Sequence, residues 1–478
     1  NGLMSFVNMK NCITFYQTAE EMQADLLKKH CSELISSHWD QFSSEDFAHM
    51  PAPLLYRMFK TKTEYPLHTA IRTEREDVVF LYLIEFDSQL SVKVNEVDNK
   101  GDLALDLSLK SQQRGIAQTL VANKADVNRK DNSGKCLLYK AIQRGDEFAA
   151  EFLINSDCDV NIATHLDKET PLHMVSRFDP KVTDAQVIQG MAHIARLLLD
   201  HKADVNTQDS TGSTPLHNAI ISKNEAVFEV LLSSKKINME IKNSDGHTAL
   251  WLALQHQEEG PGDEVSPDYE ETSLAARLIQ AKASPDAIEP ESGNSLLHLA
   301  AQHRYQAAGI FLTKHGASVG HPNFKGETPL HVACEEGLAD LVHELLMHGA
   351  NPNYQTVGTP VSALNIAALG FGDSEPEVSQ QTPLHLALTK GHHSVVQVFL
   401  DYKVQLAKSG STNKRILPNF NVKDSQGQTV LGLALWNHMH DIADRLLKCG
   451  ANINEKNTAG MTLLHQAIET QDTNSALF

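Results

Sequence analysis

One short pattern returns along the whole chain, and it limits the fold more than any other feature. Its clearest form is TPLHVA from Thr328, and weaker copies keep a leucine at the place of Leu330. Successive leucines lie 38, 33, 34, 44, 34, 47, 33, 54, 47 and 33 residues apart, so a unit of 33 or 34 residues recurs with inserts. The aligned leucines are Leu67, Leu105, Leu138, Leu172, Leu216, Leu250, Leu297, Leu330, Leu384, Leu431 and Leu464. This period predicts stacked small units, each touching only its neighbours, rather than one globular core.

Each unit reads as helix, turn, helix, turn. Thr-Pro suits the start of a helix for two reasons. The first N–H groups of a helix have no partner within it, so the N–H that proline lacks is not needed there, and the proline ring fixes φ near the helical value. The leucine and the following alanines form the buried stripe of that helix. Glycine, which tolerates positive φ, recurs at the turn between the helices and again after the second helix. These glycines are Gly145, Gly337 and Gly391 at the first turn, and Gly316, Gly349 and Gly450 at the second.

The 33-residue period, the TPLH start and the two glycine positions resemble the ankyrin repeat. The resemblance implies an all-α solenoid of about eleven repeats over residues 63–478, several of them with inserts. Ankyrin proteins bind protein partners through the turns and the adjacent concave face. The last repeat is cut short, so we expect more repeat sequence, and a further domain, beyond Phe478.

The histidines of the pattern could suggest metal binding. They are His68, His173, His217, His298, His331, His385 and His465. One histidine per unit cannot converge on a single metal ion, so we expect each ring to bond neighbouring backbone and tie one turn to the next. Cys334 is predicted to be a packed thiol, and His438 and His440 to lie on a surface turn.

Composition excludes several classes of function. A formal charge of −19 disfavours binding to nucleic acid or to an anionic membrane surface. No apolar run reaches membrane-spanning length, and the six cysteines stand singly, as in a protein of a reducing compartment. Phosphate-binding loops, nucleophile elbows and HExxH helices are absent from the sequence, so no enzyme is predicted.

Residues 1–62 do not repeat and are predicted to form a separate helical segment. CITFYQTAEEMQADLLKKHCSELISSHWDQF reads as two helices, and Ser43 with Asp46 as a capping box before a further helix. The spacing of Cys12, Ala19, Cys31 and Trp39 resembles a BACK domain, the helical module that usually follows a BTB domain.

A BACK-like segment before a long ankyrin array resembles the BTB–BACK–ankyrin–FYVE proteins of early endosomes. That resemblance implies a cytoplasmic scaffold, peripheral on early endosomes, that acts as a Rab GTPase effector in endosome fusion, endocytic trafficking and macropinocytosis. Zinc and phosphatidylinositol 3-phosphate would bind a FYVE finger outside this chain, so no cofactor or metal is expected within it. The alternative from BTB–BACK architecture is a substrate adaptor of a cullin-type ubiquitin ligase.

The inserts are where partner binding is predicted. Between Gly349 and Thr382, and again after Lys403, the extra residues follow a second helix and should enlarge the turn between repeats. The first insert offers apolar side chains and the second offers basic ones, an arrangement that suits an acidic partner. The predicted partner-binding residues are Leu369, Phe371, Lys408, Lys414 and Arg415. The alternative is that both inserts are linkers without a binding role.

Overall fold

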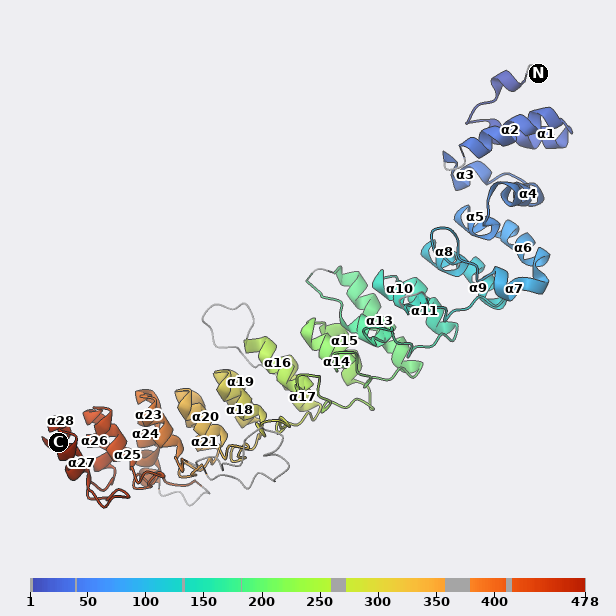
Figure 1. The fold of residues 1–478 in the computed structure, drawn as a ribbon. Helices are drawn as coiled ribbons and strands as arrows, with labels where there is room; N and C mark the ends of the chain where they lie inside the picture. The colour runs from blue at the N-terminus through green and yellow to red at the C-terminus, as the bar shows by residue number, and fades with distance from the viewer. Residues whose placement is uncertain are drawn as a thin grey trace, which may run out of the picture. The chain divides into compact units, whose positions relative to one another are not determined.

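The computed structural model of the chain is built from helices (Figure 1). It describes residues 3–38, 41–130, 134–181, 183–258, 272–356, 379–409 and 415–477. The helices form two compact units, Asn1–Ser210 with Ala226–Ser234, and Thr211–Glu225 with Lys235–Phe478. Within the described ranges the extended pairing is confined to isolated bridges in the turns between repeats, such as Lys130 with Cys136. The predicted all-α class is confirmed.

The first unit holds the N-terminal segment and the first repeats. The segment contains η1 (Met4–Phe6), α1 (Cys12–Glu21), α2 (Asp25–Ser37), α3 (Ser44–Phe47) and α4 (Ala52–Lys62). The repeat helices of this unit are α5 (Pro66–Arg72), α6 (Glu76–Glu85), η3 (Asp87–Gln89), α7 (Leu90–Lys93), α8 (Ala104–Lys110), α9 (Arg114–Ala122), α10 (Leu137–Gln143), α11 (Glu147–Asn155), α12 (Pro171–Ser176), α13 (Ala185–Asp200) and most of α15 (Glu225–Leu232).

The second unit holds the remaining repeats. Its helices are α14 (Pro215–Ile221), α16 (Ala249–Glu258), α17 (Leu274–Gln280), α18 (Leu296–Gln302), α19 (Gln306–Lys314), α20 (Pro329–Glu335), α21 (Ala339–Met347), α23 (Pro383–Thr389), α24 (His393–Ser409), α25 (Val430–Trp436), α26 (His440–Lys448), α27 (Leu463–Glu469) and α28 (Thr473–Leu477). Helices of successive repeats pack on one another, as α18 does on α20 and α20 on α23.

The N-terminal segment packs directly on the first repeat. The two predicted helices are present as α1 and α2, and the backbone N–H of Ser43 bonds Asp46 at 2.7 Å in the predicted capping box. Helix α4 packs on α5 and α6. The guanidinium of Arg75 donates to the backbone oxygens of Phe47, at 2.5 Å, and Met50, at 2.7 Å. The segment therefore covers the exposed side of the first helix pair, whereas its assignment as a BACK domain stays a prediction.

The aligned leucines form the core, with one exception. The ten from Leu67 to Leu431 are at most 3% exposed, because each lies between its own helix pair and a neighbouring one. Leu464 is 54% exposed, so the expectation that every such leucine is buried was wrong. Burial at this position needs a neighbouring helix pair on each side of α27.

One insert differs from the expectation that it would only enlarge a turn. The insert after Lys403 was predicted to belong to the turn, yet helix α24 continues to Ser409 and has 17 residues, whereas α21 has 9. The prediction was wrong there because the inserted residues are good helix formers. In the repeat of Leu172, where 11 residues were predicted to be added at or beside the turn between the two helices, the second helix α13 has 16 residues.

The longest insert leaves the stack uninterrupted. Residues 357–378 lie outside the described ranges, yet α20 packs on α23 and α21 packs on α24. The two ends of the insert meet: the hydroxyl oxygens of Thr356 and Ser379 are 3.1 Å apart, and the backbone N–H of Thr356 bonds the oxygen of Gln381 at 3.0 Å. The chain thus leaves the stack and returns to it at one place.

Candidate partner-binding site

The histidines of the pattern connect neighbouring repeats. In α20 the ring nitrogen Nδ1 of His331 accepts the backbone N–H of Thr328 at 3.2 Å and lies 2.8 Å from its hydroxyl oxygen. The other nitrogen, Nε2, therefore carries the proton and donates it to the backbone oxygen of Gln381 in the next repeat at 3.2 Å. His68, His217, His298 and His385 make the corresponding bond to the next repeat. Their predicted structural role is confirmed.

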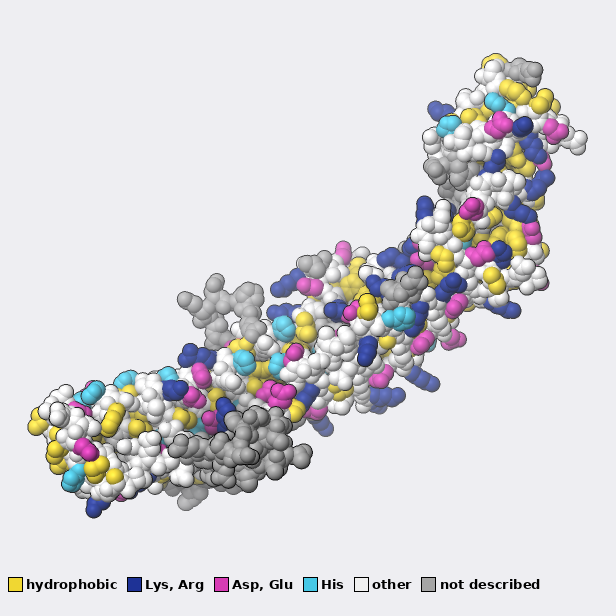
Figure 2. Space-filling view, viewed as in Figure 1, with side chains coloured by type: hydrophobic (Ala, Val, Ile, Leu, Met, Phe, Trp, Pro, Cys, Tyr) yellow, Lys and Arg dark blue, Asp and Glu magenta, His cyan; other side chains and the backbone are white. Residues whose placement is uncertain are grey.

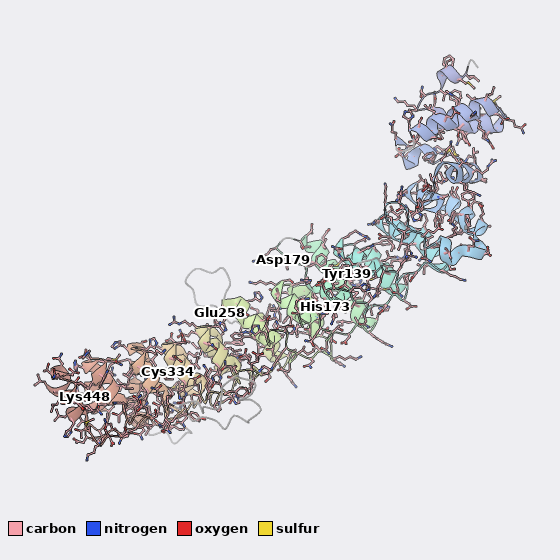
Figure 3. The ribbon with its side chains drawn as sticks, in the orientation of Figure 1. Tyr139, His173, Asp179, Glu258, Cys334 and Lys448 are labelled. Atoms are coloured by element: carbon pink, nitrogen blue, oxygen red, sulfur yellow. The ribbon has the colours of Figure 1, made fainter. Side chains whose placement is uncertain are left out.

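Burial keeps these rings neutral. Loss of solvent, only partly offset by the bond to a backbone oxygen, lowers the pKa of His298 and of His331 from 6.5 to about 4. Across the described ranges no group of three or more His, Cys, Asp or Glu side chains is placed to hold a metal ion. Cys334, labelled in Figure 3, is fully buried as predicted, and burial raises its thiol pKa well above the usual value.

In two of the units that lack the histidine, the side chain in its place also bonds the next repeat. Asp106 follows Leu105 and bonds Arg144 of the next repeat at 3.2 Å. Tyr139 follows Leu138, and its hydroxyl donates to the carboxylate of Glu169 at 3.3 Å. In these two units the position after the leucine is therefore a site of contact between repeats although TPLH is lost.

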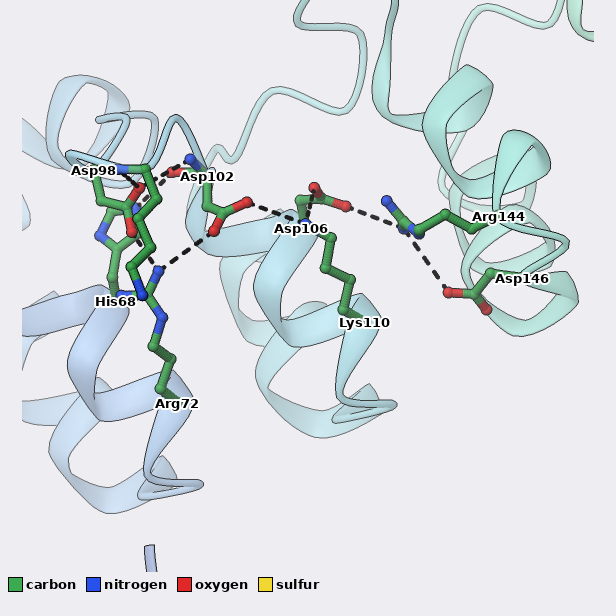
Figure 4. Close-up of polar contacts among 9 residues, drawn as sticks. His68, Arg72, Asp98, Asp102, Asp106, Lys110, Arg144 and Asp146 are labelled. Atoms are coloured by element: carbon green, nitrogen blue, oxygen red, sulfur yellow. Dashed lines mark hydrogen bonds and ion pairs between the residues drawn. The ribbon is translucent and has the colours of Figure 1, made fainter. Parts of the chain in front are cut away.

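A line of charged side chains runs across α5, α8 and α10 (Figure 4). Its members alternate in sign: Arg72 with Asp98 and Asp102, Lys110 with Asp102 and Asp106, Arg144 with Asp106 and Asp146. Burial alone would raise the pKa of Asp98, but Arg72 and two backbone N–H groups outweigh it and hold that pKa below the usual value. Because each charge of this line has an opposite partner, the line connects the first three repeats rather than offering an unpaired charge to a ligand.

The structure places only part of the predicted partner-binding site. Leu369, Phe371 and Lys414 lie outside the described residues. Lys408 belongs to the C-terminal turn of α24, and its side chain is not described. Arg415, near the end of the second insert, is exposed and is the first described residue after Ser409.

Residues 415–421, which we term the return segment, are fixed to the preceding repeat. The side-chain amide of Asn353 donates to the backbone oxygen of Leu417 at 2.8 Å, and its oxygen accepts the backbone N–H of Asn419 at 2.7 Å. Phe420 is 1% exposed, with the ammonium of Lys403 4.2 Å from the centre of its ring. The segment therefore holds a defined position on the array.

Sequence reasoning missed the apolar residues of this region. Ile416 is 40% exposed and Leu417 is 51% exposed, directly after Arg415, and Val404 on α24 is 37% exposed. The signal was the string KRIL, in which only the two charges were interpreted. An apolar pair beside the basic side chain of Arg415 is thus present in the return segment itself, without the first insert.

Comparison with known proteins identifies the repeat family. The family model described as ankyrin repeats matches residues 184–260, 268–356 and 364–457, more than half of the chain. The chain belongs to the ankyrin-repeat family. It is 51% identical to the human protein Rabankyrin-5 over 99% of this chain, and 50% identical to mouse Rabankyrin-5 over 98%. The similarity to Rabankyrin-5 therefore extends along almost the whole sequence.

The chain spans 41% of the length of these two relatives. Among solved structures, the ankyrin repeat domain of Bcl-3 is 23% identical, covers 54% of this chain and 95% of its own, and has a TM-score of 0.40. None of the described helices is long and apolar enough to cross a membrane. Since ankyrin repeats form protein-interaction surfaces, the chain is a non-catalytic interaction scaffold.

Proposed function

We propose that this scaffold is the protein-binding part of an early-endosomal Rab GTPase effector, acting in endosome fusion, endocytic trafficking and macropinocytosis. The observation that carries the proposal is the identity of about half of all residues to Rabankyrin-5 along 99% of the chain. An array whose repeats are tied together by buried histidines suits this role, because a fixed scaffold loses little conformational freedom when a partner binds.

We place the docking site for such a partner on the return segment. Ile416 and Leu417 supply an exposed apolar anchor, and Arg415 supplies a positive charge beside it. Lys408, Lys414, Leu369 and Phe371 complete the proposed site. An apolar anchor contributes most of the affinity, whereas the basic side chains mainly raise the rate of association with an acidic partner.

The proposal is tested with the purified chain and an early-endosomal Rab GTPase loaded with either a non-hydrolysable GTP analogue or GDP. An effector binds the GTP-analogue form preferentially. Ile416→Asp with Leu417→Asp should weaken that binding by about tenfold or more, as loss of a central apolar anchor does. Leu166→Asp is the matched control, because Leu166 is 82% exposed elsewhere on the array.

Two results would count against the proposal in different ways. Equal binding to both nucleotide forms, or binding to neither, would contradict the Rab effector role but not the role as an interaction scaffold. Nucleotide-dependent binding that the Ile416 and Leu417 substitutions leave unchanged would move the docking site away from the return segment.

A further inference from the structure

In several repeats a side chain in the turn after the second helix bonds the next repeat. The amide of Asn421 shows the full arrangement: its oxygen accepts the backbone N–H of Asn452 at 2.7 Å, and its nitrogen donates to the backbone oxygen of Gly450 at 3.4 Å. We call this two-bond contact the clasp. Asn353 makes the same two bonds to the return segment, and Asn95 makes them to the repeat that follows it. The clasp is a second tie between neighbouring repeats, distinct from the bridging histidines.

The clasp weakens over three successive repeats and is lost at the third. Along the chain the residues at the clasp position are Asn95, Asn128, Asn161, Asn206, Glu240, Asp286, Gly320, Asn353 and Asn421. A carboxylate accepts but cannot donate, so Glu240 and Asp286 can make only the bond to the backbone N–H of the next repeat, at 2.8 and 2.6 Å. Gly320 has no side chain, and no described residue accepts the backbone N–H of Asn351, the counterpart of Asn452. The junction between the repeats of α19 and α21 therefore lacks the clasp.

The rest of this junction is held together. At the start of the first helices, Nε2 of His298 donates to the backbone oxygen of Glu327 at 2.9 Å. In the second helices, α19 and α21 approach closely at Gly309, where an added Cβ would lie 2.8 Å from a methyl carbon of Leu341. The two repeats are thus fixed along their helices and lack a tie at the turn of Gly320.

We propose that this junction is a joint at which the second unit bends: α18 and α19 stay packed on α20 and α21, while the turns of Gly320 and Asn351 move apart and together. Hinges often contain small residues, which absorb changes of backbone angle. Bending there changes the angle between the repeats before the joint and those after it, and so the shape of partner surface that they can contact together. Figure 2 shows basic, acidic and histidine side chains interspersed over α19 to α21, so the face in view offers no single charge to a ligand. The missing clasp is what distinguishes this part of the array.

Gly320→Asn should supply the missing clasp. The φ of Gly320 is not in the left-handed region and an added Cβ would meet no atom within 4 Å, so asparagine fits there without strain. In native-state hydrogen exchange of the whole chain, the amide of Asn351 should exchange about fivefold or more slowly in this variant than in the unaltered chain. The matched control is Gly320→Ala, which adds a Cβ but no hydrogen-bonding group and should leave the exchange of Asn351 unchanged.

The bending is measured by the distribution of distances between spin labels placed at Gln280 and Lys448, which are exposed at the ends of α17 and α26. Four repeat steps of about 10 Å separate these positions, a span of roughly 40 Å. Cys449 is replaced by serine in every variant, because the other cysteines are buried and only this thiol would compete for the label. Gly320→Asn should narrow the distribution, Asn353→Gly should widen it by removing a clasp, and Gly320→Ala should leave its width unchanged.

Four results would overturn the proposal. One is an amide of Asn351 that is protected as strongly as that of Asn452 in the unaltered chain. The others are a distribution that Gly320→Asn does not narrow, a narrowing of the same size in Gly320→Ala, and a distribution that Asn353→Gly does not widen.

Discussion

Nε2 of His331 donates to the backbone oxygen of Gln381 at 3.2 Å, across fifty residues of sequence. The bond joins α20 to the repeat of α23 and passes over the longest insert of the chain. The same histidine closes the start of its own helix through Thr328. One side chain thus completes a helix cap and holds two repeats together.

Removing this ring should destabilise the array. His331→Ala loses both connections and leaves buried polar groups unpaired, which should lower the free energy of unfolding by about 1–3 kcal/mol. His343 is exposed on α21 of the same repeat, so His343→Ala should change the free energy of unfolding little. Denaturant unfolding of the two variants makes the comparison, and equal effects would contradict the bridging role.

The buried histidines should make stability depend on pH. Burial lowers the folded pKa of His298 and of His331 to about 4, below the ordinary 6.5, so between these values the unfolded chain binds more protons than the folded chain. Stability is therefore complete above pH 6.5 and falls as pH decreases toward 4. In that window, each of His298 and His331 should lower the free energy of unfolding by as much as about 1.4 kcal/mol for each unit by which the pH falls. Unfolding from pH 7 to 4 should show a smaller slope in His298→Gln, and an unchanged slope would contradict the lowered pKa.

The chain should bind no stoichiometric zinc. The histidines that bridge repeats are spread one per repeat, and the cysteines stand singly, so no tetrahedral set is available among the described residues. Elemental analysis of the purified chain, after dialysis against a weak chelator, should find well under one zinc per molecule. One tightly held zinc per chain would contradict this.

The longest insert should be removable. Because Thr356 and Ser379 meet at its ends, residues 357–378 can be replaced by a short Asn-Gly turn without moving α20 or α23. Closing a shorter loop costs less entropy, so stability should stay equal or rise by about 1 kcal/mol. Gln355→Ala, which removes bonds from its amide to Gln380 and Lys423, is the destabilising comparison. A folded chain that loses several kcal/mol on deletion would show that the insert supports the stack.

The repeat helices could be predicted from the sequence because their signals are local. The Thr-Pro start, the leucine and the glycine of each turn act within one unit, and these positions in the structure match the pattern. Gly337 has a φ of +77°, and a Cβ there would lie 2.8 Å from His392 Nδ1, so both conformation and space require glycine. The bridging role of the histidines followed from the same register.

The rest depended on contacts that the sequence pattern does not encode. The return segment is held by a hydrogen bond between Asn353 and Asn419, which are 66 residues apart. The exposure of Ile416 and Leu417 could therefore not be inferred from their sequence neighbours. The extension of α24 was missed because the insert was placed by counting from the repeat length, although Gln405, Leu406 and Ala407 favour helix. The exposure of Leu464 depends on which helices flank it and not on its own motif.

The central claim is that each repeat is held only by its neighbours. The most direct test is native-state hydrogen exchange of the Leu330→Ala variant. Leu330 is fully buried, so the substitution should cost about 2–5 kcal/mol. Leu464→Ala, at a half-exposed position, should cost about 1 kcal/mol or less. The predicted result is that Leu330→Ala lowers amide protection in α20 and in the helices packed against it, while α5 and α8 keep theirs. A uniform loss of protection along all repeats would contradict the account.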